Sequence, residues 1–220
     1  TKLTNGIIEH KLREHNMLTK VKRKVVKYGQ HINLGCFRVE FIRTNHSIQD
    51  AAALAIYSAA GTVVHTGDFK VDYTPVYGDA IDLQRFGEIG KKGVLALMCD
   101  STNAERAGFT MSEKTVGKTF DNIFHDHQNN RIIVATFASN VDRVQQIINT
   151  AYKFGRKVVV EGRSMVNIIS TASELGYLKI PDNTLIEIEQ LKNYPDEKTV
   201  LITTGSQGEP LAALSRMASG

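Results

Sequence analysis

The stretch from residue 131 to residue 162 decides the fold: RIIVATFAS (131–139), NVDRVQQIINTAYKFG (140–155) and KVVVEG (157–162). The first and third pieces are short apolar runs, and the piece between them has the apolar spacing of a helix. A strand, a helix and a second strand in this order indicate a crossover between parallel strands. Strands that are apolar without interruption are typical of a sheet covered by helices on both faces. The stretch therefore predicts an α/β domain on a parallel sheet.

The same alternation extends on both sides of this stretch. Helix-like and strand-like pieces follow one another in SEKTVGKTFDNIF (112–124), SMVNIISTASELG (164–176), LIEI (185–188), TVLITTG (199–205) and QGEPLAALSRMAS (207–219). The pattern predicts a doubly wound, mainly parallel α/β domain. We assign it residues 111–220.

The first half of the chain has a different rhythm. Short strand-like runs occur at FRVEFIRT (37–44), TVVHTG (62–67) and VLALMCD (94–100). DAAALAIYS (50–58) is compatible with a helix, because alanine favours helices, or with one arm of a hairpin that turns at Ala60-Gly61. The loop-like composition of AERAGFT (104–110) marks the end of this first domain, assigned to residues 1–110.

Composition excludes several classes of protein. The chain has a formal net charge of +4, which favours a polyanionic partner only weakly. The basic cluster KVKRKVVK (20–27) is either a solvated face or a contact for an RNA backbone. No membrane helix or signal peptide is predicted, so a cytoplasmic location is expected. The chain lacks an initial Met and stops after a helical pattern, so we expect a piece of a longer protein.

The two cysteines, Cys36 and Cys99, form no CxxC pair. Their spacing argues against both a disulfide scaffold and a cysteine zinc site. Each has apolar neighbours at the edge of a predicted strand, and we expect both to be buried as small hydrophobic residues.

Residues suited to metal binding follow three of the predicted strands. His46 lies in RTNHS (43–47), Asp68 in HTGDFK (65–70) and Asp100 in CDST (99–102). Ligand-bearing loops follow the carboxyl ends of strands in α/β folds, and His and Asp are suitable ligands for Zn²⁺ or Mn²⁺. Taken singly, each residue could equally be a turn, a cap or a solvent-exposed side chain.

The order of these motifs resembles one family. NHSIQDA (45–51) followed by GTVVHTGDFKVDYTP (61–75) is similar to two metal-binding motifs of the metallo-β-lactamase nucleases. DSTNAERAGFT (100–110) is similar to the first β-CASP motif. Three further stretches resemble the bacterial RNase J family: FASNVDRVQQ (137–146), GRSM (162–165) and TTGSQGEP (203–210).

This resemblance implies part of an αββα metallo-β-lactamase domain followed by a β-CASP domain that is incomplete at its C-terminus. It implies two metal ions, usually Zn²⁺ with Mn²⁺ as the rival. His46 would be a ligand of one ion and Asp68 the carboxylate shared by both. Asp100 would be a catalytic residue beside the site, orienting a ligand or relaying a proton.

The resemblance also implies a pocket for RNA and its 5′-phosphate in the second domain. Its residues would be Ser139, Asn140, Arg163, Ser164, Gly205, Ser206, Gln207 and Gly208. Helix N-termini rich in Gly and Ser offer free N–H groups to an anion, and Arg adds a permanent charge. The alternative is that these residues only cap helices, as in any α/β protein.

The chain departs from the family pattern in two places. The HxHxDH motif, which supplies most of the metal ligands, is absent, and His125-Asp126-His127 belongs to a predicted helix end. Two ligands cannot hold zinc tightly, so we expect this chain by itself to be inactive. Asp142 stands where the family often has His, and an acid there would repel a phosphate unless it points away or pairs with Arg143.

The resemblance thus implies a metal-dependent ribonuclease in RNA processing and decay, with 5′-to-3′ exonuclease action on 5′-monophosphate RNA and endonuclease action. The alternative is a non-catalytic, RNA-binding partner subunit of such a nuclease. RNA is the expected partner, together with a second copy (dimer or tetramer) or a paralogous subunit, and no membrane. A sugar-phosphate or nucleotide-binding function for residues 112–220 is disfavoured, because GxGxxG and GxxxxGK[ST] are absent.

Overall fold

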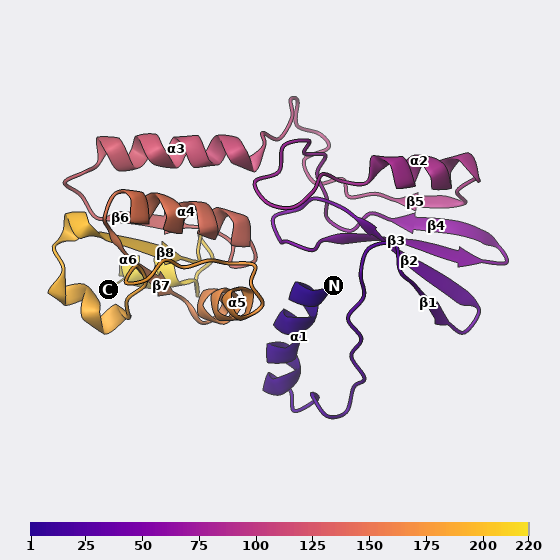
Figure 1. The fold of residues 1–220 in the computed structure, drawn as a ribbon, viewed down its shortest axis with the longest axis horizontal. Helices are drawn as coiled ribbons and strands as arrows, with labels where there is room; N and C mark the ends of the chain where they lie inside the picture. Colours follow the sequence, from indigo (N-terminus) through magenta and orange to yellow (C-terminus); the bar gives the residue numbers. More distant parts are fainter. Residues whose placement is uncertain (220) are drawn as a thin grey trace. The chain divides into compact units, whose positions relative to one another are not determined.

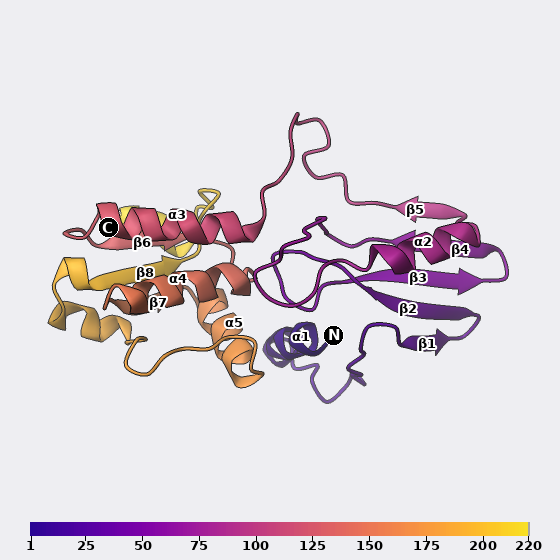
Figure 2. The same ribbon diagram turned by 45° about the horizontal axis from the view of Figure 1, so that its top comes forward.

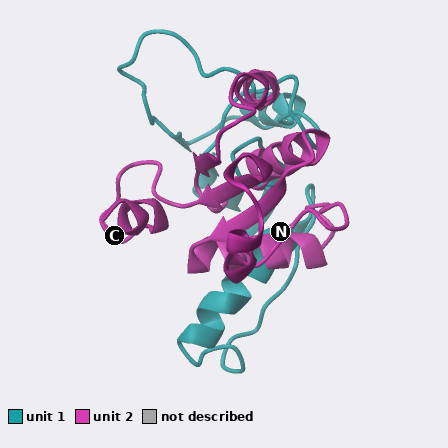
Figure 3. Cartoon of the chain, turned by 90° about the vertical axis from the view of Figure 1, so that its left-hand side faces the viewer, with its two compact units in different colours: residues 1–112 teal, residues 113–220 magenta. Residues whose placement is uncertain are grey.

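The computed structural model describes residues 1–219 of the chain. It divides into two compact units, Thr1–Ser112 and Glu113–Gly220, shown in different colours in Figure 3. The division falls two residues after the boundary that the sequence predicts. Both units mix helices and strands, and the predicted α/β class is confirmed.

Unit 1 is a five-stranded sheet with strands in the order β1-β2-β3-β4-β5 (Figure 1). The first four strands are antiparallel neighbours, whereas β5 lies parallel to β4. The strands span His31–Leu34 (β1), Phe37–Arg43 (β2), Ala52–Ser58 (β3), Gly61–His65 (β4) and Ala96–Met98 (β5). Helix α1 (Lys2–Glu14) precedes the sheet and α2 (Leu83–Lys91) lies between β4 and β5. The sequence analysis predicted none of β1, α1 and α2.

The structure decides the ambiguous stretch 50–58 in favour of a strand. Residues 52–58 pair with β2 on one side and with β4 on the other. The β3–β4 turn consists of Ala59 and Ala60, because Ser58 pairs with Gly61. Alanine fits in β3 because Ala53 and Ala55 are fully buried, in a core cluster that includes Ile89 of α2.

A buried carboxylate fixes α2 on the sheet. Glu40 in β2 is 2% exposed and accepts hydrogen bonds from Arg85 of α2 at 2.6 and 2.9 Å. The Tyr57 hydroxyl donates a third hydrogen bond at 2.6 Å. Burial alone would raise the pKa of Glu40, but the hydrogen bonds from Arg85 and Tyr57 outweigh burial and hold the pKa at about 2. The Glu40 carboxylate is therefore charged near neutral pH. Its ion pair with Arg85 fixes α2 on the sheet, and with it the end of the 66–82 segment that leads from β4 to α2.

Unit 2 contains a three-stranded parallel sheet in the order β6-β8-β7 (Figures 1 and 2). The strands are β6 (Ile132–Ala135), β7 (Lys157–Glu161) and β8 (Thr199–Thr203), and every residue of β8 is buried. Helices α3 (Glu113–Asp126), α4 (Val141–Lys153) and α5 (Arg163–Glu174) alternate with them, and α3 packs on α4. The predicted parallel sheet with crossover helices is confirmed.

Two details of unit 2 differ from the sequence-based prediction. LIEI (185–188) does not form a full strand, because only Leu185 bridges to Val158, and its last residue already begins a 3-10 helix, η1 (Ile188–Asn193). A second short 3-10 helix, η2 (Asp196–Lys198), precedes β8. Helix α6 covers only Ala213–Ser219 of the predicted helical stretch 207–219, because residues 205–210 form a turn around Gly205 and Gly208.

The prediction that both cysteines are buried is wrong. Cys36 is exposed in the two-residue turn between β1 and β2, and Cys99 is exposed directly after β5. An apolar neighbourhood in sequence did not give burial, since Leu34, Phe37 and Met98 beside them are also exposed. No helix among residues 1–219 combines the length and the apolar character that crossing a membrane requires.

Candidate functional site

His46 and Asp68 lie next to each other in unit 1. His46 follows the end of β2, and Asp68 follows the end of β4 by three residues. The distance from His46 Nε2 to Asp68 Oδ2 is 3.8 Å, and the Asp68 side chain is largely exposed. Two side chains that are 22 residues apart in sequence therefore present a nitrogen and a carboxylate oxygen to the same space.

Asp100, after β5, belongs to the same group of loops. Its peptide N–H donates a hydrogen bond to the Thr66 hydroxyl at 3.0 Å, which joins it to the segment that carries Asp68. Hydrogen bonds from the N–H and hydroxyl of Thr102 hold the pKa of the Asp100 carboxyl below its usual range. The N–H of Phe69 lowers this pKa further, so Asp100 is an ionised neighbour of the pair.

The pair has the geometry of a partial metal site. Ligand atoms at roughly 2.0–2.2 Å from one zinc ion can lie at most about 4.4 Å apart, so a separation of 3.8 Å allows a shared ion. Among residues 1–219, no group of three or more His, Cys, Asp or Glu side chains is arranged to hold a metal. His65 uses its Nδ1 to accept a hydrogen bond from the Gly67 N–H. The residues present fit a metal ion as part of its ligand set.

Two polar residues that hold these loops were not singled out by sequence reasoning. The buried Thr66 accepts the Asp100 N–H and donates to the Gly67 carbonyl at 2.7 Å. Asn45, beside His46, binds both ends of the 70–81 loop. Each is a polar residue just after a strand end and within two residues of a candidate ligand, and this position is the signal that could have identified it.

Unit 2 has a hollow of about 330 Å³ where β6 and β8 end and α5 begins. Its lining residues are Thr136, Phe137, Ala138, Ser139, Ser164, Ile168, Thr204, Gly205 and Glu209. Of the predicted pocket residues, Ser139, Ser164 and Gly205 line this hollow. Asn140, Arg163, Ser206, Gln207 and Gly208 are not among the residues that line it.

The predicted residues that do not line the hollow have other positions nearby. The Asn140 side chain caps α4 by accepting the Arg143 N–H at 3.1 Å, as the alternative interpretation allowed. Arg163 is the exposed first residue of α5, next to Ser164. The Gln207 N–H donates to the Glu209 carboxylate at 3.1 Å in the exposed loop that contains Ser206 and Gly208.

One hydroxyl in this hollow has an unused hydrogen-bonding capacity. Thr136 is 1% exposed, and its Oγ1 has no hydrogen-bond partner among the described residues. Buried hydroxyls are nearly always hydrogen-bonded, so a partner from a ligand or water is expected. Thr136, Ser139 and Ser164 offer hydroxyls, and α4 its N-terminus, to an oxyanion, while the Glu209 carboxylate on the same lining accepts the Gln207 N–H.

The departure at position 142 has a structural explanation. Asp142 lies in the first turn of α4, where a carboxylate is stabilised by the helix dipole, and it is 9% exposed. Arg143 forms an ion pair with Glu113 of α3 at 2.7 Å. The Arg143 guanidinium is thus engaged with a different acid from the one that the sequence suggested.

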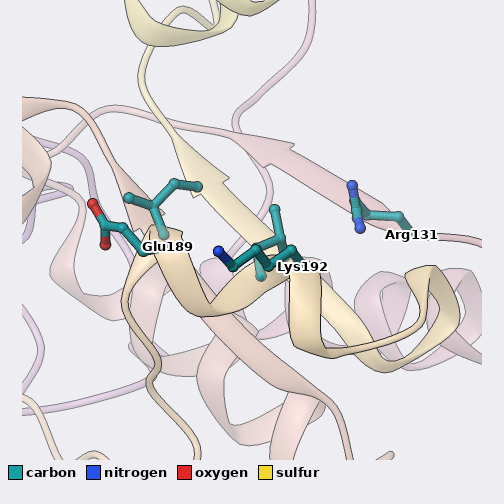
Figure 4. Close-up of a pocket in the computed structure, with 5 residues that line it drawn as sticks. Arg131, Glu189 and Lys192 are labelled. Atoms are coloured by element: carbon teal, nitrogen blue, oxygen red, sulfur yellow. The ribbon is translucent and has the colours of Figure 1, made fainter.

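A second hollow of unit 2, of about 490 Å³, is lined by Arg131, Ile188, Glu189, Leu191 and Lys192 (Figure 4). Arg131 is bound to the Asp196 carboxylate and, through Nε, to the Thr199 hydroxyl at 3.0 Å. Its charge is therefore used to hold η2 against the start of β8.

Comparison with known proteins identifies the family of these two units. Residues 129–220 match the family model described as "Ribonuclease J, beta-CASP domain". The whole chain is 46% identical to Ribonuclease J of Synechocystis sp., 45% to Ribonuclease J of Helicobacter pylori and 40% to Ribonuclease J2 of Bacillus subtilis. It spans 34%, 32% and 39% of the length of these relatives.

The fold also has a solved counterpart, a protein of unknown function from Enterococcus faecalis V583. The TM-score is 0.64 at 16% identity, over 99% of this chain and 58% of that one, and this likeness concerns the fold alone. The matches to the ribonuclease J relatives extend over the whole chain, including the loops that carry His46, Asp68 and Asp100. The chain therefore belongs to the ribonuclease J family, of whose members it spans about a third.

Proposed function

We propose that the full-length protein is a metal-dependent ribonuclease that hydrolyses RNA phosphodiesters, both inside the strand and from 5′-monophosphate ends. The observation that carries this proposal is the 3.8 Å approach of His46 Nε2 and Asp68 Oδ2 in a chain of the ribonuclease J family. His and Asp at this separation are a ligand combination that zinc sites use.

His46 would supply a neutral imidazole nitrogen to one Zn²⁺ ion, and Asp68 would supply the carboxylate shared by two ions, with Mn²⁺ as the rival metal. Bound metal supplies a water nucleophile at neutral pH and stabilises the charge on the scissile phosphate. Asp100 is ionised and tied to the Asp68 segment through Thr66 and Phe69, so it can orient a ligand or accept a proton there.

The hollow of unit 2 would bind the 5′-phosphate of the RNA. The free hydroxyl of Thr136, the hydroxyls of Ser139 and Ser164 and the first turn of α4 are suited to a phosphate oxygen. A site that holds the end of the strand gives exonuclease action a defined starting point. RNA is accordingly the proposed partner, and a homo-oligomer or a paralogous subunit is the proposed assembly.

The replacement Asp68→Ala in the full-length protein tests this proposal. We expect RNA hydrolysis to fall by about a thousandfold or more, because one carboxylate of the metal site is lost. Bound metal, measured by elemental analysis, should fall with it, while the circular dichroism spectrum stays unchanged. Asp79→Ala, which removes another exposed carboxylate of the same segment, is the matched control and should retain activity.

Full activity of Asp68→Ala would sink the two-metal assignment. A wild-type protein that binds RNA but never cleaves it, with or without added Zn²⁺ or Mn²⁺, would point instead to the non-catalytic partner subunit.

A further inference from the structure

Asn45 contacts both ends of the loop that follows Asp68. Its carbonyl accepts the Lys70 N–H at 2.8 Å, in an isolated antiparallel bridge between residues 45 and 70. Its side-chain amide donates to the Asp79 carbonyl at 3.0 Å and accepts the Ile81 N–H at 2.7 Å. One residue therefore closes the base of the 70–81 loop.

This closure lies between the two candidate ligands. Asn45 is bonded covalently to His46, and Lys70 follows Asp68 by two residues. The backbone path from His46 to Asp68 through the 45–70 bridge is therefore only a few residues long. The alternative path along the chain runs through the whole β3–β4 hairpin.

Arg43 also holds the 79–82 end of the loop, in addition to the Asn45 side chain. Arg43 donates from Nε to the Ala80 carbonyl at 2.9 Å, and its guanidinium pairs with the Asp79 carboxylate at 3.0 Å. The Asp82 N–H donates to the Arg43 carbonyl, and Ile81 is buried. The main-chain contacts of Arg43 and the burial of Ile81 fix residues 80–82, and the exposed ion pair with Asp79 adds little. Asn45 joins that fixed end to the end that carries Asp68.

We propose that Asn45 is a positioning residue for the metal ligands. Its hydrogen bonds to both ends of the 70–81 loop keep Asp68 at the distance from His46 that metal binding requires. This inference rests on the proposed metal site. A ligand pair held in register binds a metal with less loss of conformational freedom, and residues that orient metal ligands typically change affinity 10–100-fold.

The test measures zinc affinity in the metal-free, full-length protein by competition with a chromogenic chelator. Asn45→Ala removes both side-chain contacts with the 79–81 end, leaves the main-chain bridge to Lys70 in place, and should weaken zinc binding by about 10-fold. Asn45→Asp keeps the acceptor for the Ile81 N–H and loses the donor to the Asp79 carbonyl, so an intermediate loss is expected. The thermal unfolding midpoint without metal is recorded for each variant.

Asp79→Ala is the matched control, because Asn45 binds the main-chain carbonyl of this residue and only the exposed ion pair with Arg43 is lost. It should leave zinc affinity within about twofold of wild type. A merely structural Asn45 would lower the unfolding midpoint and leave zinc affinity unchanged.

Two results overturn the proposal in distinguishable ways. If the wild type binds zinc and both Asn45 variants bind it equally well, only the role of Asn45 is refuted. If the wild type itself binds no zinc, the proposed metal site fails and the role of Asn45 fails with it. Should Asn45→Ala not fold, Asn45→Asp alone decides between these results.

Discussion

Unit 1 and unit 2 present their candidate functional groups in opposite ways. In unit 1 the groups are side chains, His46, Asp68 and Asp100, on loops that follow three strands of a largely antiparallel sheet. In unit 2 the hollow lies where parallel strands end and helices begin, and its lining combines four hydroxyl residues with Gly205, three apolar residues and Glu209.

This difference predicts how each unit responds to mutation. A site made of side chains fails when a single ligand is removed, while its loops keep their fold. A site built on turns at the ends of strands is sensitive also to residues that alter chain geometry. The following substitutions test this contrast.

Gly205→Ala should have the larger effect on unit 2. Gly205 has a φ of 113°, and an added Cβ would lie 2.9 Å from Leu214 Cβ and 3.1 Å from Ala212 Cβ. We expect a loss of about 2–4 kcal/mol in the free energy of opening this region, from backbone strain and the close contacts together. Hydrogen exchange of the Leu214 N–H, which is bonded to the Thr204 carbonyl, measures it in the full-length protein.

Gly208→Ala is the control in the same turn. Its φ is 73°, and an added Cβ meets no atom within 4 Å, so only backbone strain of about 1 kcal/mol is expected. Equal exchange rates in the two variants would show that the close packing around Gly205 does not matter.

Arg163→Ala should have a smaller effect than Gly205→Ala. Arg163 is exposed at the first position of α5, beside Ser164 of the hollow. Loss of a charge-assisted hydrogen bond should weaken use of 5′-monophosphate RNA by about 1.5–3 kcal/mol, roughly 10- to 150-fold in kcat/KM. Hydrolysis of 5′-hydroxyl RNA should change much less. Equal losses on both substrates would show that Arg163 contacts the RNA backbone and does not recognise the 5′-phosphate.

Much of unit 2 could be predicted from the sequence because its strands are apolar and its helices periodic. RIIVA and KVVVE became parallel strands on either side of β8, and the helix between them begins at the capping residue Asn140. Local pattern and tertiary packing agree there. The prediction of a strand at LIEI (185–188) failed because a four-residue stretch does not reveal whether a neighbouring strand edge is free to pair along its whole length.

In unit 1 the candidate ligands could be found because His46, Asp68 and Asp100 each stand in a recognisable motif. The residues that hold these loops in place could not be predicted. Asn45, Thr66 and the Glu40–Arg85 pair act through contacts with residues far away in sequence. Helix α2 was missed because its short amphipathic stretch contains Gly87 and Gly90, which weaken a helical pattern. Its position depends on burial of Ile89 and on Arg85 reaching Glu40.

The central claim, that His46 and Asp68 bind the same metal, is tested most directly by anomalous scattering from crystals of the full-length protein grown with Zn²⁺. Data collected above and below the zinc absorption edge locate the ion without assumptions about its ligands. The account predicts an anomalous peak at about 2.0–2.2 Å from both His46 Nε2 and an Asp68 carboxylate oxygen. A zinc peak bound by other residues, with neither His46 nor Asp68 within bonding distance, would contradict it.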